Sequence, residues 1–201
     1  MIVVGITGNL ASGKTHVAKV FKKLGAQVFD ADVSARRALG RGRPETRAVL
    51  KLFGKEFLSR NGGIDRAKLA RHVFSHPADL KKLNIIVHPG VIMDCLTVIE
   101  RSRHKKGILA LDVPLLFESK MGALADRTIV VRSSRADSLK RAERRGVPRA
   151  LALRILASQW SPERKAKLAD HVIDNDGTAA HLESRAREIF KAIRKETGAS
   201  Q

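Results

Sequence analysis

Residues 1–15 read MIVVGITGNLASGKT, and this stretch decides the fold. Its last part, Gly8 to Thr15, matches the phosphate-binding pattern G-x-x-x-x-G-K-[ST]. The pattern follows an apolar run, Ile2 to Ile6, that has the composition of a buried central strand, and it precedes a helical segment beginning near Lys14. A strand, a glycine loop and a helix in this order predict a phosphate cradle. The alternative is a glycine turn before an ordinary helix.

Each part of the predicted cradle has a chemical role. Gly8 and Gly13 let the chain curl so that successive backbone N–H groups point at phosphate oxygens. Lys14 is placed to reach the β and γ phosphates, and the Thr15 hydroxyl to complete the coordination of Mg²⁺. The predicted ATP-binding residues of this segment are Gly8, Ala11, Ser12, Gly13, Lys14, Thr15 and His16.

Four further apolar runs have the character of buried strands. They are Ala26 to Phe29, Ile108 to Val113, Thr128 to Val131 and His171 to Ile173. Because these runs alternate with longer segments of helical spacing, the sequence predicts an α/β fold with a parallel sheet. The segment after Gly177 predicts a final amphipathic helix.

Two long helical segments interrupt this alternation. The first, roughly Arg36 to Arg103, is too long for a simple crossover, and the second, Arg135 to Ala169, is strongly basic. Breaks in the first are expected at Arg43-Pro44, Asn61-Gly62-Gly63, His76-Pro77 and His88-Pro89, and in the second at Gly146-Val147-Pro148 and Ser161-Pro162. We predict a single domain with a core of about 1–35, 104–134 and 170–201, a substrate region of about 36–103 and a lid of about 135–169.

The predicted lid carries a concentrated positive charge. Its basic residues and their immediate flank are Arg132, Arg135, Lys140, Arg141, Arg144, Arg145, Arg149 and Arg154. Only Asp137 and Glu143 oppose them within this stretch. A helical hairpin of this charge is costly to fold without an anion, so we predict that it closes over a bound phosphate.

Three carboxylates follow predicted strands. Asp112 closes the apolar stretch Ile-Leu-Ala-Leu-Asp that begins at Ile108, which is the setting of a carboxylate that holds Mg²⁺, although a strand-capping role is the alternative. Asp30 and Asp32 follow the run Ala26 to Phe29, at the sheet edge where parallel α/β proteins bind ligands. A kinase needs a carboxylate there to orient the acceptor hydroxyl and take its proton. The alternative is that one of the two caps a helix beginning near Val33.

The overall composition limits the possible partners. Lys and Arg number 39 against 20 Asp and Glu, a formal net charge of +19 that attracts polyanions. Aromatic residues make up only 4%, with no Tyr, so a base-stacking platform for single-stranded nucleic acid is poorly supplied. The single cysteine excludes an internal disulfide, and no signal peptide or membrane span is expected, so the predicted location is the cytoplasm.

Further residues form an ordered set of motifs along nearly the whole chain. They are Gly5-Ile6-Thr7-Gly8, Ser12-Gly13-Lys14-Thr15, Leu24-Gly25, Asp30-Ala31-Asp32, Phe74, His88-Pro89, Asp112-Val113-Pro114-Leu115-Leu116-Phe117-Glu118, Leu139-Lys140-Arg141, Gln159, Ala169-Asp170-His171-Val172-Ile173-Asp174-Asn175 and Gly177. This set resembles the dephospho-CoA kinase family, the last enzymes of coenzyme A biosynthesis. The cradle alone defines a superfamily, whereas the DAD, HP, PLLFE and VIDN blocks in this order are specific.

The resemblance implies a P-loop NTPase fold, with a five-stranded parallel sheet flanked by helices, a helical CoA-binding insertion and a helical lid. It implies ATP-dependent phosphorylation of the ribose 3′-hydroxyl of dephospho-CoA, giving coenzyme A and ADP, with Mg²⁺. Asp32 resembles the acceptor-side carboxylate, and Arg141 the lid arginine that meets the ATP phosphates. Arg66 and His88 are the implied substrate contacts, and Asp32, Lys14 and Arg141 the implied catalytic residues.

Several alternatives stay open. His88 before Pro89 also suits a buried helix-capping histidine, and Glu118 and Gln159 also suit structural roles. The family often has glycines where this chain has Asn9 and Ala11, and a basic residue in place of Pro162, for which Arg164 or Lys165 would substitute. The rival functions are a nucleotide, nucleoside or shikimate kinase, and a basic nucleic-acid-binding protein. The sequence does not predict the oligomeric state.

Overall fold

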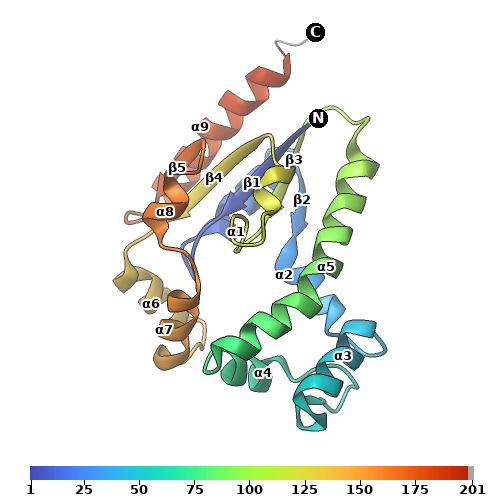
Figure 1. Cartoon of the computed structure of the whole chain (residues 1–201). Coiled ribbons are helices and arrows are strands. Elements are labelled where there is room, and N and C mark those ends of the chain that lie inside the picture. Colours follow the sequence, from blue (N-terminus) through green and yellow to red (C-terminus); the bar gives the residue numbers. More distant parts are fainter. Residues whose placement is uncertain (199–201) are drawn as a thin grey trace. The chain divides into compact units, whose positions relative to one another are not determined.

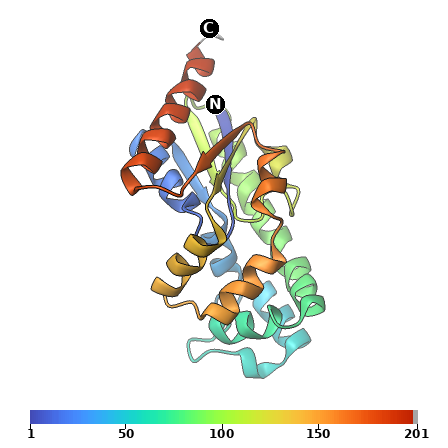
Figure 2. The same ribbon diagram turned by 90° about the vertical axis from the view of Figure 1, so that its left-hand side faces the viewer.

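A computed structural model of the chain describes residues 1–198 (Figures 1 and 2). Residues 199–201, the end of the predicted core segment 170–201, lie outside the described residues. In chain order the elements are β1 (Ile2–Thr7), α1 (Lys14–Lys23), β2 (Gln27–Asp30), α2 (Ala31–Ala38), α3 (Pro44–Phe53), η1 (Lys55–Phe57), α4 (Arg66–Val73), α5 (Pro77–Ser102), β3 (Ile108–Asp112), η2 (Met121–Leu124), β4 (Arg127–Arg132), α6 (Arg135–Arg144), α7 (Arg149–Ser158), α8 (Pro162–Ala166), β5 (His171–Asp174) and α9 (Ala179–Gly198).

The chain folds as two compact units. The first comprises Met1–Asp30 and Thr97–Gln201, and the second Ala31–Leu96. The predicted phosphate cradle and lid lie in the first unit, whereas Asp32, Arg66 and His88 lie in the second. The functional division into core, substrate region and lid stays a prediction.

The first unit is built on one five-stranded parallel sheet with the strand order β2-β3-β1-β4-β5. All five predicted strands are confirmed, and so is the α/β class. Strand β1 is central because its residues are almost all apolar and buried. In the register of the sheet, Asp112 lies beside both Ile6 and Asp30, so the ends of β1, β2 and β3 meet at one edge.

Helices cover both faces of this sheet (Figure 2). Helices α1 and α9 pack on one face against Val4, Ile6 and Ile129, and Leu182 and Phe190 are among the residues of α9 that they bury there. This confirms the predicted amphipathic helix after Gly177. On the other face lie α8 and η2 (Figure 2). A side chain at Gly5 would lie 2.7 Å from Leu116, so the absence of one lets this second layer approach β1 closely.

The second unit has a small core of its own. Phe57 of η1, Leu69 and Val73 of α4, and Val49 of α3 are buried together. Three of the expected breaks here are confirmed: α3 begins at Pro44, a turn occupies residues 61–63, and α5 begins at Pro77.

The expected break at His88-Pro89 is wrong. Helix α5 runs without interruption from Pro77 to Ser102 with Pro89 inside it. Because proline has no backbone N–H, the helix loses one hydrogen bond at this position. The long helix nevertheless continues past Pro89, as some helices with an internal proline do. The helix-capping alternative for His88 is therefore also wrong, because no helix end lies there.

By length and composition alone, α5 is one helix that would be able to cross a membrane. This is a weak indication, since long helices of other kinds pass the same test. The expectation that the chain has no membrane span stays a prediction.

Candidate active site

The phosphate-binding loop lies between β1 and α1, at the edge where the strands end. Gly13 has φ 106°, in the left-handed region, and a side chain there would lie 2.4 Å from Asn175 Nδ2. A side chain at Gly8 would lie 2.3 Å from the carbonyl oxygen of Val131. Both positions therefore require glycine for steric reasons. The loop ends at the first turn of α1, where the positive end of the helix dipole favours an anion.

Ala11 departs from the conformation that its residue type prefers. It has φ 54° and is one of two non-glycine residues with positive φ in the described chain. This explains why glycine is often found there in the family that the sequence resembles. Ala11 is also buried against Leu139, Ala142 and Ala152 of the two lid helices. The loop and the α6–α7 hairpin thus share one small apolar core.

Lys14 and Asp112 form the buried ion pair of the site. The distance from Lys14 Nζ to Asp112 Oδ1 is 2.9 Å, and their side chains are 12% and 2% exposed. The Thr15 hydroxyl accepts from Lys14 Nζ at 3.4 Å. Burial raises the pKa of Asp112, and the Lys14 charge and the Thr15 hydroxyl oppose this shift. A lysine, a hydroxyl and a carboxylate are thereby gathered at the first turn of α1, although 98 positions separate Lys14 from Asp112.

Asn175 connects the loop with the lid, and the sequence did not single it out as a site residue. Its Nδ2 donates to the carbonyl of Ser12 at 2.7 Å, and its own carbonyl accepts from Arg141 Nη2 at 2.7 Å. Its place in the VIDN block was the only sequence signal for it. Asn175 fixes Arg141 of α6 next to the cradle.

Three buried polar atoms around the cradle have no hydrogen-bond partner among residues 1–198. They are Ser12 Oγ, His16 Nε2 and Arg141 Nη1. Burying a polar group without a partner costs free energy, and such groups in native proteins commonly serve a ligand. Ser12, His16 and Arg141 are three of the predicted ATP-binding residues, so this arrangement fits an anionic ligand on the loop.

The segment after α7 clamps the loop from the other side. Asn9 Nδ2 donates to the carbonyl of Trp160 at 2.9 Å, and the N–H of Leu10 donates to Gln159 Oε1 at 3.0 Å. Arg164 stacks on the Trp160 ring at 3.5 Å from its centroid. Gln159 therefore has the structural role that the sequence left open. Asn9, where glycine is common, gains a bond that glycine cannot make.

A buried ion pair supports this clamp. Lys165 is fully buried, and its Nζ lies 2.9 Å from Glu118 Oε1 and 3.0 Å from the carbonyl of Pro114. The same Glu118 oxygen accepts from the N–H of Trp160 at 3.0 Å. Burial lowers the pKa of Lys165, and Glu118 opposes this shift. Glu118 therefore has the structural role that the sequence left open. The Lys165 ammonium is held by two protein groups, the Glu118 carboxylate and the Pro114 carbonyl.

Glu118→Ala is expected to lower the free energy of unfolding by about 3–5 kcal/mol, because it leaves the Lys165 ammonium buried without a countercharge. Urea denaturation measures this loss. The double variant Glu118→Gln/Lys165→Met is the matched control and should recover most of it, since no unpaired charge remains buried. A loss below about 1 kcal/mol in Glu118→Ala would show that water reaches Lys165 in solution.

The lid charge is partly neutralised by a contact that the sequence stretch did not show. Arg132, at the end of β4, pairs with Asp174 at the end of the neighbouring strand β5. This pairing raises the pKa of Arg132 and lowers that of Asp174. Within the hairpin, Arg149 lies 3.4 Å from Glu143. Asp137 and Glu143 are the acidic residues within the stretch, and Asp174, which lies outside it, adds a partner for Arg132.

In the second unit, Asp32 lies in the first turn of α2 and is exposed. Helix α2 begins at Ala31, two positions earlier than expected, so Asp32 lies inside the helix and does not cap it. The Asp32 charge raises the pKa of Arg66, while desolvation and the charge of Arg36 lower it more strongly. Asp32, Arg36 and Arg66 thus form one local charge cluster.

His88 lies on α5 and is partly buried, and this burial lowers its pKa. The neutral imidazole is therefore favoured at neutral pH. The structure brings together the predicted residues of the cradle and lid in the first unit, and Asp32 with Arg66 in the second.

A parallel sheet with a glycine loop and helix after its central strand, a buried lysine–carboxylate pair at that loop and a basic helical hairpin beside it define a P-loop kinase. The comparison with known proteins is more specific. A model of the family described as dephospho-CoA kinase matches residues 2–181. The chain belongs to the dephospho-CoA kinase family. By this membership it is a transferase that uses ATP to phosphorylate dephospho-CoA.

Individual relatives agree with this family. The chain is 40% identical over 196 residues to a dephospho-CoA kinase of Carboxydothermus hydrogenoformans, covering 96% of this chain and 93% of that protein. The solved dephospho-CoA kinase of Campylobacter jejuni has a TM-score of 0.71 at 26% identity, covering 96% and 98%. A second solved structure, TT1252 from Thermus thermophilus, has a TM-score of 0.76 at 34% identity, covering 95% and 96%. The rival kinases and the nucleic-acid-binding protein are not favoured.

Proposed function

We propose that the protein transfers the γ-phosphoryl group of ATP to the 3′-hydroxyl of the dephospho-CoA ribose with the residues predicted above. The observation that carries this proposal is the Lys14–Asp112 pair of 2.9 Å at the first turn of α1, with Thr15 beside it. Assays of ADP formation with dephospho-CoA beside nucleotides, nucleosides and shikimate test the acceptor. Phosphorus NMR of the product tests the position. A different preferred acceptor, or a phosphate elsewhere on the ribose, would contradict the proposal.

The donor is held by the cradle. Backbone N–H groups within the loop from Gly8 to Thr15 bind the phosphates, apart from that of Leu10, which donates to Gln159. Lys14 binds the β and γ phosphates, and Arg141 neutralises charge that spreads over the transferred group. Phosphoryl transfer has a loose transition state, so catalysis here consists of positioning and electrostatic stabilisation. In this arrangement the phosphates give hydrogen-bond partners to Ser12 Oγ, His16 Nε2 and Arg141 Nη1, which have none among residues 1–198.

Thr15 and Asp112 are the residues that would hold Mg²⁺. A hydroxyl and a carboxylate are oxygen ligands that suit this ion, and Lys14 Nζ contacts both of them, at 3.4 Å and 2.9 Å. Bound Mg²⁺ would offset charge on the phosphates. It would also favour the ionised form of Asp112, which burial disfavours.

The acceptor is served by the second unit. Asp32 is exposed, accepts the proton of the attacking hydroxyl and orients that hydroxyl. Arg66 binds anionic groups of the substrate as a permanent cation. His88, with the neutral form favoured, supplies a hydrogen-bonding contact without adding charge.

Amides from Arg135 to Lys167 are expected to exchange fast with solvent in the free protein and to slow markedly with an ATP analogue plus dephospho-CoA. The exposed arginines of the hairpin repel one another until phosphates supply negative charge. Closure then excludes water that would hydrolyse ATP. Hydrogen exchange measured by mass spectrometry is the test, and β1, Ile2–Thr7, is the internal control that stays protected in both states.

Two outcomes would contradict the moving lid or its arginine. Equal exchange of the hairpin with and without ligands would show that it does not close. Arg141→Ala is expected to lower kcat/KM for ATP roughly tenfold to a hundredfold, the size of hydrogen bonds to a charged group. An unchanged KM and kcat in this variant would remove Arg141 from the site.

We also infer that the protein acts in the cytoplasm and has no nucleic-acid partner. Its single cysteine, Cys95, is buried, and burial raises the pKa of the thiol to about 11, so it is suited neither to a disulfide nor to nucleophilic chemistry. The charge of +19 serves anionic small substrates in this proposal. Salt-dependent binding to duplex or single-stranded nucleic acid at physiological ionic strength would contradict it.

A further inference from the structure

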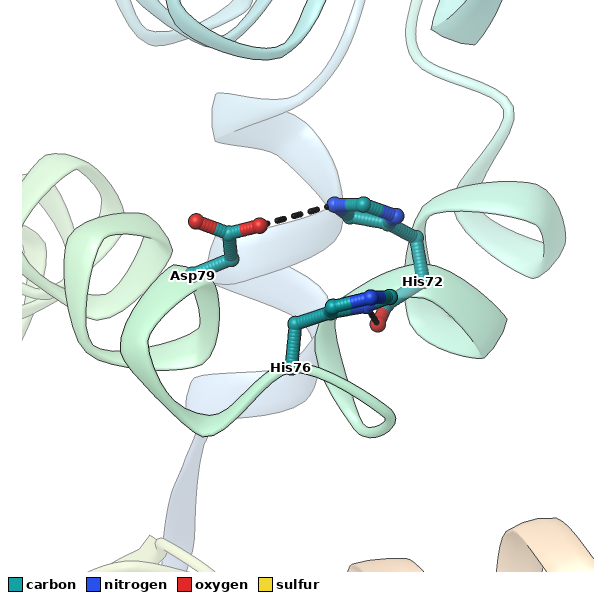
Figure 3. A group of neighbouring side chains, drawn as sticks. All are labelled: His72, His76 and Asp79. Atoms are coloured by element: carbon teal, nitrogen blue, oxygen red, sulfur yellow. Dashed lines mark hydrogen bonds and ion pairs between the residues drawn. The ribbon is translucent and has the colours of Figure 1, made fainter.

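Three potential metal ligands meet at the junction of α4 and α5, outside the kinase site. His72 lies in α4, His76 in the turn that follows, and Asp79 in the first turn of α5 (Figure 3). One ligand atom from each residue lies within 4.8 Å of the others. Among the described residues this is the one such group of His, Cys, Asp or Glu.

Local hydrogen bonds prepare these side chains for a cation. His76 Nδ1 donates to the carbonyl of His72 at 2.8 Å, which fixes the tautomer and leaves the lone pair on Nε2. A backbone carbonyl on the other ring nitrogen is the usual support of a metal-ligating histidine. His72 Nε2 donates to Asp79 Oδ2 at 2.9 Å. The other oxygen of Asp79 is held by Lys82 at 3.0 Å, which orients Oδ2 toward His72.

The surroundings are partly apolar. The His72 ring packs against the rings of Phe53 and Phe57, at centroid distances of 6.1 and 5.4 Å, and stacks with His76 at 4.4 Å. His76 is exposed, so the group is open to solvent on one side. Aromatic walls limit the rotation of His72 and reduce the competition from water, while the open side leaves a path for an ion and its remaining water ligands.

We propose that His72, His76 and Asp79 bind one Zn²⁺ ion, which joins the end of α4 to the start of α5. Two imidazoles and a carboxylate form a ligand set that suits zinc, with water in the fourth position. Ligand atoms about 2.1 Å from a tetrahedral ion lie roughly 3.4 Å apart. When the ion binds, the 2.9 Å distance between His72 Nε2 and Asp79 Oδ2 must lengthen slightly. Distances between ligand atoms that reach up to 4.8 Å must shorten by side-chain rotation. The ion replaces the proton shared by His72 and Asp79.

The test is calorimetric titration of the nucleotide-free full chain, with Zn²⁺ as the titrant. The buffer contains excess Mg²⁺, which occupies oxygen-rich sites. The expected result is one Zn²⁺ per chain, with affinity reduced at least tenfold in His76→Ala and in Asp79→Asn. His104→Ala is the matched control, since His104 is exposed and lies outside the group. It should bind as the parent does. Zn²⁺ should also raise the Tm of the parent and of His104→Ala but not of His76→Ala.

The exposed position of His76 makes its replacement safe for folding, so the test holds even if a variant of the half-buried His72 is unstable. Co²⁺ gives an independent readout: visible d–d bands of a low-coordinate ion are expected in the parent and not in His76→Ala. Absence of Zn²⁺ binding in the parent, or equal affinity in the parent and His76→Ala, would overturn the proposal. The three side chains would then serve only as a hydrogen-bonded helix junction. Neither result depends on the kinase activity.

Discussion

Lys14→Met is expected to lower kcat by about three orders of magnitude or more while the chain stays folded. Lys14 combines two roles in the site. Its ammonium would move from Asp112, 2.9 Å away, to the β and γ phosphates, where it stabilises charge that develops during transfer. Methionine keeps the length and apolar stem of the side chain and removes only the charge and its donors.

Steady-state kinetics with saturating ATP and dephospho-CoA measure this loss, and Lys19→Met is the matched control. Lys19 is exposed on the same helix, so its replacement should leave kcat unchanged. Lys14→Met also leaves Asp112 buried without its cation, and a lower Tm is expected as a result. Circular dichroism and protected amides in β1 distinguish this from unfolding. Turnover near the parent rate would show that the cradle is misassigned.

Asp32→Asn is expected to lower kcat by roughly two or more orders of magnitude with ATP binding little changed. Asparagine keeps the size of the side chain but cannot accept a proton from the acceptor hydroxyl. Asp32 is exposed in the first turn of α2, so its replacement removes no packing. The effect should therefore fall on catalysis and not on stability.

Asp30→Asn is the comparison that decides between the two carboxylates. Asp30 ends β2 beside Asp112, and its charge contributes to the raised pKa of that residue. Its loss is expected to change Mg²⁺ dependence or stability more than the chemical step. An inactive Asp30→Asn together with an active Asp32→Asn would reverse the assignment. Initial rates over a range of ATP concentrations separate the two cases, because binding and kcat are read independently.

The elements that the sequence predicted well are those with short-range causes. A short apolar run such as Ile2 to Ile6, followed by a glycine loop, favours a covered strand, and Gly8 and Gly13 are needed where the chain makes this turn. Both signals lie within a few residues of each other. The same holds for the start of α3 at Pro44 and of α5 at Pro77, because proline suits the first helical turn.

Predictions of helix boundaries from single proline or capping residues were less successful. Pro89 was expected to end a helix, yet α5 continues through it from Pro77 to Ser102, with one backbone hydrogen bond fewer at the proline. Asp30 and Asp32 illustrate the same limit. Helix α2 begins directly after β2, and the sequence alone did not show which carboxylate would lie inside its first turn.

The apolar runs and the glycine pattern were enough to predict the α/β class and the phosphate cradle, and the order of the motifs was enough to predict the family. The partners of the buried charges became visible in the three-dimensional fold. It paired Lys14 with Asp112 and enclosed Lys165 with Glu118. It also placed Asn175 between the cradle and Arg141. These contacts depend on strand order and register, which bring together residues distant in sequence. Strand and loop patterns are local, so they can be predicted from neighbouring residues. The partner of a buried charge lies far away in the sequence, so it depends on how the sheet brings distant segments together.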